Sequence, residues 1–197
     1  MSLPASSNPH PREAVAERNL EAILDAAERL MACGAAPSVS AVAAEARVSR
    51  PTVYAHFPDR QQLVEAVVER TVSHVTAAIA SAQPGAGRAG DALVRLIAAS
   101  WDQLGRHELI AQAASRELSA EAMHRAHHAP LKMLRQLLER GQADGSFRAD
   151  VPAELLVKCA LALIHTTADA ARHGVVAHEV AGRTAEQLIG ELWRASD

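Results

Sequence analysis

The side chains best suited to bind a partner lie in residues 49–60, where an otherwise alanine-rich chain reads SRPTVYAHFPDR. Hydroxyl, guanidinium, phenol and imidazole groups follow one another within this short segment. Such groups donate hydrogen bonds to phosphate oxygens and to the edges of nucleic-acid bases. The segment therefore has the chemistry of a DNA-binding surface, provided that the local fold presents these groups on one side.

The flanking residues predict two short helices joined by a tight turn. Ser38 is a suitable N-cap for the first helix and Ser49 for the second. Pro51 is tolerated in a first helical turn because its missing N–H would have no helical partner there. A longer helix begins after Asp59 and continues to about Ala82. Two short helices at this spacing are typical of a helix-turn-helix, whose second helix enters the major groove of DNA.

The second short helix has a polar side that we assign to DNA. Ser49 and the free N–H groups of the first turn suit a phosphate, and Arg50 and Thr52 are placed to reach base edges or the neighbouring backbone. Tyr54 and His56 can donate to phosphate oxygens. The complete set of candidate DNA contacts is Ser38, Arg47, Ser49, Arg50, Pro51, Thr52, Tyr54, His56 and Arg60.

The same residues also allow simpler interpretations. Val53 and Phe57, four positions apart, should face the core, and Tyr54 can serve as a packing residue beside them. Arg60 can be a solvated charge rather than a phosphate contact. A helix pair of this kind also occurs by chance in unrelated helical proteins.

The segment SVSAVAAEARVSRPTVYAHFPDRQQLVEAVV resembles the DNA-binding region of TetR-family transcriptional repressors. The resemblance is specific over about residues 18–70 and only architectural beyond them. It implies a recognition helix at about 49–56 and a basic phosphate contact at Arg60. It also implies a larger helical domain that binds a small-molecule effector and forms a homodimer. Arg47 stands where the family usually has Gly, and a left-handed backbone there costs about 1 kcal/mol.

Composition predicts an all-α protein. Of the 197 residues, 49% are hydrophobic but only 3% are aromatic, and Ala, Leu, Val, Glu and Arg dominate. No apolar run reaches the roughly 20 residues of a membrane span, and the N-terminus lacks a signal-peptide pattern. We therefore expect a cytoplasmic protein without membrane contact. The predicted divisions are a flexible arm at 1–12, a helix-turn-helix domain at 13–58, a connecting helix at 59–82 and an effector-binding and dimerisation domain at 83–197.

The C-terminal half should contain five more helices after the glycine-rich connector at Gln83–Gly90. We place them near 91–104, 107–116, 119–141, 152–173 and 178–194, with Asp150 as an N-cap. Candidate effector contacts are the apolar and polar residues Leu96, Ile97, Trp101, Met123, His127, Leu134, Leu161, His165 and Asp169. Each of these is equally well explained as ordinary core.

The last two predicted helices are candidates for a dimer interface. Their apolar residues are Leu155, Leu156, Cys159, Leu163, Leu188, Leu192 and Trp193. The two cysteines, Cys33 and Cys159, are expected to be buried free thiols.

Histidines introduce a second hypothesis, because His124 and His128, like His165 and Asp169, are one helical turn apart. No third ligand follows from spacing, and no phosphate-binding loop or nucleophile motif is present. We therefore expect neither a metal nor another cofactor, and no enzymatic activity. The predicted function is a ligand-responsive repressor that binds a palindromic DNA operator. The alternatives are a regulator without a small effector and a helical metalloenzyme that uses the histidine pairs.

Overall fold

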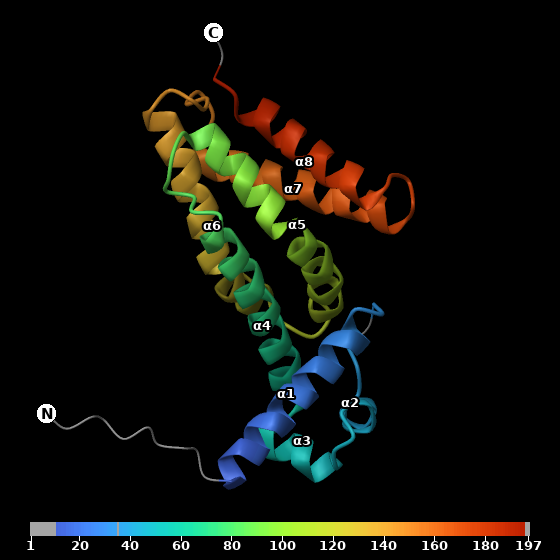
Figure 1. The fold of residues 1–197 in the computed structure, drawn as a ribbon. Helices are drawn as coiled ribbons and strands as arrows, with labels where there is room; N and C mark the ends of the chain where they lie inside the picture. The colour runs from blue at the N-terminus through green and yellow to red at the C-terminus, as the bar shows by residue number, and fades with distance from the viewer. Residues whose placement is uncertain (1–10, 35, 196–197) are drawn as a thin grey trace, which may run out of the picture.

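The computed structural model describes residues 11–34 and 36–195, which form eight helices (Figure 1). The helices are α1 (Pro11–Met31), α2 (Val39–Glu45), α3 (Arg50–His56), α4 (Arg60–Ser81), α5 (Ala89–Ala114), α6 (Ala120–Ala143), α7 (Ala153–Arg172) and α8 (His178–Trp193). The predicted all-α fold with an N-terminal helix-turn-helix is confirmed. Of the arm predicted at 1–12, residues 1–10 lie outside the described residues, and α1 already begins at Pro11.

Buried apolar side chains form two clusters that meet along α4. The first cluster joins α1, α2 and α3 to the N-terminal half of α4, and it includes Val72. The second cluster begins at Val75 and joins the C-terminal end of α4 to α5, α6, α7 and α8. Ile110 and Ala122, which come from α5 and α6, also pack into the first cluster. Helix α4 is therefore a single rod that belongs to both halves of the molecule (Figure 1).

Two predictions for the C-terminal half are wrong in detail. The helices expected at 91–104 and 107–116 are one continuous helix, α5, which runs through Gly105. A glycine costs a helix about 1 kcal/mol, and the buried residues Trp101 and Ile110 on either side anchor α5 in the two clusters. Asp150 does not cap α7. Its carboxylate accepts hydrogen bonds from Arg148 at 2.7 and 2.8 Å, and Pro152 occupies the N-cap without a side-chain bond.

Both cysteines are free thiols, but the expectation that both are buried is wrong. Cys33 is exposed and Cys159 is half-buried. Cys33 follows the end of α1, where the chain turns away from the first cluster, so its position in an apolar sequence pattern does not lead to burial. Among the helices of the described residues, none is long and apolar enough to cross a lipid bilayer.

Candidate DNA-binding surface and effector cavity

Side-chain caps and one left-handed residue shape the helix-turn-helix. The Ser38 hydroxyl accepts the backbone N–H of Ala41 at 3.2 Å, and the Ser49 hydroxyl accepts that of Thr52 at 3.2 Å. These bonds satisfy N–H groups that would otherwise lack partners at the starts of α2 and α3. Arg47, between the helices, has a φ of 56°, so the predicted left-handed turn forms without glycine. Pro51 lies in the first turn of α3, as predicted.

Helix α3 is held by one side and exposes the other. Val53 and Phe57 are buried in the first cluster, as predicted, so the orientation of α3 is fixed. The Tyr54 side chain is 52% exposed, which excludes its role as a core residue. Arg50 is also exposed, and its guanidinium donates to the Ser40 hydroxyl of α2. The exposed candidates are Ser38, Arg47, Ser49, Arg50, Pro51, Tyr54 and Arg60, whereas Thr52 and His56 are half-buried.

Arg60 already has protein partners. Its guanidinium donates to the carbonyl oxygens of Pro37 at 3.1 Å and Ala36 at 2.6 Å. It also forms an ion pair of 3.1 Å with Glu117, which lies between α5 and α6. Arg60 is therefore not a freely solvated charge. It joins the loop between α1 and α2 to the C-terminal half, and any phosphate that approaches it must compete with Glu117.

A cavity of about 190 Å³ lies between α4, α5, α6 and α7. Its walls are almost wholly apolar, and the residues that line it are Val72, Val75, Ile79, Leu93, Leu96, Ile97, Ser100, Leu104, His107, His127, Pro130, Leu131, Leu134, Ala160, Leu161, Ile164, His165 and Ile189. Val72, Val75 and Ile79 are contributed by α4, so the cavity borders the helix that both clusters share.

Six of the nine effector candidates line this cavity, and three do not. Ile97, His127, Leu134, Leu161 and His165 lie in its wall, together with Leu96. The three others have different partners. Trp101 packs against α8 and donates to the His178 carbonyl at 3.3 Å, Met123 packs on the first cluster, and Asp169 accepts a hydrogen bond from Arg172. These three residues therefore lie outside the cavity wall.

Ser100 and His107 lie in the cavity wall but were not among the residues predicted from the sequence. Both follow Ile97 at three- or four-residue spacing through Leu104, so they lie on one face of α5. This periodic signal was present in the sequence. The helix break predicted at Gly105 placed His107 in a separate helix, whereas Ser100 lies within the helix predicted at 91–104.

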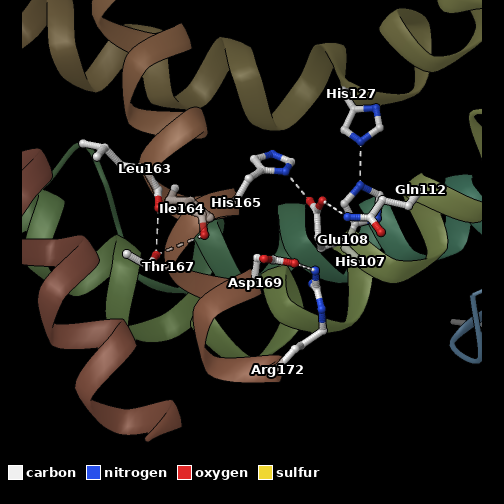
Figure 2. A network of polar contacts seen from close by, with 10 residues as sticks. All are labelled: His107, Glu108, Gln112, His127, Leu163, Ile164, His165, Thr167, Asp169 and Arg172. Carbon is white, nitrogen blue, oxygen red and sulfur yellow. Dashed lines mark hydrogen bonds and ion pairs between the residues drawn. The ribbon is translucent and has the colours of Figure 1, made fainter. Parts of the chain in front are cut away.

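Two histidines of the cavity wall, His107 and His127, are hydrogen-bonded to each other, with their ring planes tilted by 55° (Figure 2). His127 Nδ1 donates to the Met123 carbonyl at 2.7 Å, which leaves its Nε2 free to accept from His107 Nε2 at 2.5 Å. The Thr71 hydroxyl lies 3.1 Å from His107 Nδ1 and completes the array. Burial, assisted by the neighbouring His127, lowers the pKa of His107 to about 4. His107 is therefore neutral at pH 7.

A carboxylate and a third histidine lie beside this pair. His165 Nδ1 contacts one oxygen of Glu108, and Gln112 donates to the other at 2.7 Å (Figure 2). The hydrogen bond from His165 lowers the pKa of Glu108, and Gln112 adds to this effect while burial opposes it. The Glu108 carboxylate thus has both oxygens occupied by the protein itself.

The two residue pairs of the metal hypothesis, His165 with Asp169 and His124 with His128, lie in different surroundings. His165 pairs with Glu108, whereas Asp169 pairs with Arg172. His124 and His128 both line a surface groove between α6 and α7. Within residues 11–34 and 36–195, no group of three or more metal-ligating side chains has the geometry to hold an ion.

The predicted dimer interface divides into buried and exposed residues. Leu156 and Trp193 are buried within the chain, where Trp193 Nε1 donates to the Leu156 carbonyl at 3.3 Å. They pack inside this chain, so their assignment to an interface is corrected. Leu155 on α7 and Val180 and Leu188 on α8 are 52%, 40% and 44% exposed. They form the apolar part of the outer surface of these two helices.

Comparison with known proteins gives a consistent result for the N-terminal region. Residues 23–67 match the family described as bacterial regulatory proteins, tetR family. The HTH-type transcriptional repressor LfrR of Mycolicibacterium smegmatis is 35% identical over 86 residues, which are 44% of this chain and 46% of that repressor. The match thus spans less than half of the length of this curated relative.

Solved structures resemble most of the chain. The TetR-like regulator LfrR from Mycobacterium smegmatis, in complex with proflavine, has a TM-score of 0.70 and 25% identity, with 87% of this chain and 94% of that chain covered. The regulator FadR from Bacillus subtilis, in complex with stearoyl-CoA, has a TM-score of 0.76 with 86% and 97% coverage. Its 16% identity supports a shared fold alone.

Proposed function

We propose that this chain is a cytoplasmic transcriptional repressor of the TetR type, because residues 23–67 match the tetR family of bacterial regulatory proteins and the repressor LfrR resembles it in sequence and fold. It binds a palindromic DNA operator as a homodimer, and a small molecule in the cavity lowers its affinity for that operator. The observation that carries this proposal is the geometry of α3. Val53 and Phe57 fix the helix from below, while Arg50 and Tyr54 are exposed on the surface.

The DNA-facing residues have distinct roles in this proposal. The N-terminal turn of α3 and Ser49 hold a phosphate, since a helix N-terminus favours negative charge. Arg50 reads the major groove or the neighbouring backbone after it leaves Ser40. Tyr54 donates to a phosphate oxygen, and Arg60 reaches a phosphate only in exchange for Glu117.

Effector binding acts through α4. The cavity contacts Val72, Val75 and Ile79 of this helix, whose N-terminal half packs with α3 in the first cluster. A ligand that prefers one orientation of α4 shifts the population toward the corresponding position of the recognition helix. Proflavine in the solved LfrR structure supports a small organic molecule as the effector.

The test is binding of the purified full chain to DNA from around its own gene at two salt concentrations. We expect saturable binding that weakens with salt, because Arg contacts release counterions from DNA. Arg50→Ala with Tyr54→Ala should lower operator affinity at least 100-fold. Arg88→Ala, an exposed arginine before α5, is the matched control and should leave affinity unchanged. Equal binding by wild type and the double variant would refute the role of α3.

Dimerisation has a separate test. Leu188→Asp places a charge on the exposed apolar surface of α8 and should convert the dimer to a monomer in analytical ultracentrifugation. Val94→Asp on α5 is the control, because Val94 is equally exposed at 44% but lies outside the last two helices. Loss of the dimer in both variants, or in neither, would contradict an interface formed by α7 and α8.

A further inference from the structure

The apolar cavity and the surface groove between α6 and α7 share a wall. Leu131 of α6 and Leu161 of α7 line both spaces, and both side chains are only half-buried. His165, which also lines the cavity, is exposed. The cavity therefore approaches the surface along the seam between α6 and α7, where the groove of about 750 Å³ begins.

The groove is polar and carries the lysines of this protein. Lys132 and Lys158 are the only lysines in the 197-residue sequence, and both line the groove. Arg135 adds a third fixed positive charge, against the two carboxylates of Glu139 and Glu154. The imidazoles of His124 and His128 complete the polar wall. Without the histidines, the formal charges of the groove side chains sum to one positive charge.

The positive charges of the groove are available to a ligand. Arg135 and Lys158 form ion pairs with residues one helical turn away on their own helices, at 2.7 and 3.0 Å. Such exposed pairs are weak and exchange easily for another anion. Lys132 forms no ion pair with any side chain in the described part of the chain. The pKa of Glu154 is lowered, first by the hydrogen bond from Lys158 and then by electrostatic attraction to Lys158, Arg135 and His124. Side chains of α6 and α7 therefore act on the same carboxylate.

Most polar side chains of the cavity wall already bond to other groups of the protein. Ser100 donates to the Leu96 carbonyl at 2.7 Å, and His107 and His127 bond to each other. His165 contacts Glu108 through Nδ1 and is exposed. A polar group placed inside the cavity away from His165 would lose its bonds to water without replacement, which is unfavourable. The part of a ligand inside the cavity must therefore be apolar.

We propose that the ligand of this site is an anionic amphiphile, with a short apolar tail in the cavity and a phosphate-like head group in the groove between Lys132 and Lys158. This inference rests on the proposed function of the cavity as the effector site. A cavity of about 150 Å³ accommodates benzene, so about 190 Å³ corresponds to a tail of one substituted ring or a short alkyl chain.

The experiment measures binding of three probes with one tail, octyl phosphate, 1-octanol and octylammonium, to the full chain by calorimetry. We expect octyl phosphate to bind at least tenfold more tightly than octanol, and octylammonium more weakly than octanol. Lys132→Ala with Lys158→Ala should reduce the preference for phosphate to less than threefold and leave octanol binding unchanged. Arg106→Ala with Arg183→Ala, two exposed arginines away from the groove, is the control.

A second experiment measures how fast Lys132 and Lys158, the only two lysines of the sequence, react with an acetylating reagent. Acetylation of the two lysine amines, followed by mass spectrometry, should be slowed at least fivefold by octyl phosphate and unaffected by octanol or inorganic phosphate alone. Equal affinity for all three probes would overturn the anionic head group while it leaves an effector cavity in place. Failure of every probe to bind a protein that still binds its operator would overturn the inference and leave the DNA-binding function intact.

Discussion

The buried His107 should make the folded protein less stable at mildly acidic pH than at pH 7. Burial and the neighbouring His127 lower its pKa from 6.5 to about 4. Because the folded state binds the proton more weakly than the unfolded chain, the resulting stability is complete above pH 6.5. It is lost as the pH falls from 6.5 toward 4.

The size of this effect follows from the two pKa values. A tenfold difference in proton affinity corresponds to about 1.4 kcal/mol, so the full contribution of neutral His107 is about 3 kcal/mol. Between pH 7 and pH 5, about 2 kcal/mol of it should disappear. Glu108 acts in a lower range, because its pKa lies below 4.5 and its contribution is lost only as the pH falls further.

Urea unfolding at pH 7 and pH 5, at constant protein concentration and ionic strength, measures this loss. With an m value of about 2–3 kcal/mol/M, the midpoint of the wild-type transition should fall by roughly 0.7–1 M. His107→Gln can still donate to His127 but carries no titrating ring, so it should be less stable at pH 7 and should lose most of this pH dependence. His128→Gln, at an exposed histidine one residue further along α6, should behave as the wild type.

Parallel pH profiles for the wild type and His107→Gln would refute this reasoning. They would mean that the acid sensitivity arises from other histidines of the chain. A loss of pH dependence in His128→Gln would have the same meaning.

The remaining predictions concern helix packing and the junction between the two clusters. Gly141→Ala should destabilise the fold by about 2 kcal/mol in urea unfolding, because its new Cβ would lie only 2.0 Å from a buried aromatic ring. Gly105→Ala should instead raise stability by up to about 1 kcal/mol, since its Cβ meets only one atom at 4.0 Å. Arg70→Gln should cost about 2 kcal/mol and less at high salt, because three carboxylates of α1 surround its half-buried guanidinium. Glu117→Gln should tighten operator binding severalfold in a titration of labelled DNA, since it weakens the competitor for a phosphate at the start of α4.

Local chemistry made the helix-turn-helix predictable. Ser38, Ser49 and Pro51 act through bonds within three or four residues of their own positions, so the sequence alone specified where α2 and α3 begin. The inward direction of Val53 and Phe57 followed from their helical spacing. In each case the cause and the effect lie within one helical turn.

Long-range contacts explain what the sequence did not predict. Arg60 pairs with Glu117 across the junction of the two halves, and no spacing rule connects positions so far apart in the chain. Trp101 and Met123 have the apolar character of cavity residues but pack against α8 and the first cluster instead. The continuity of α5 through Gly105 depends on buried neighbours on both sides, which outweigh the weak helix propensity of glycine.

The length of α4 determines how far a tilt of this helix at the cavity displaces its other end beside α3. Val75 at the cavity and Leu63 beside α3 are separated by about 18 Å along this helix, at 1.5 Å per residue. A tilt of about 5° around Val75 displaces the far end by roughly 1.6 Å. In the proposed dimer, two opposed displacements amount to about 3 Å, which is close to the 3.4 Å rise of one base pair. Under the proposed function, a small angular adjustment around a modest ligand would therefore be sufficient to put two recognition helices out of register with their half-sites.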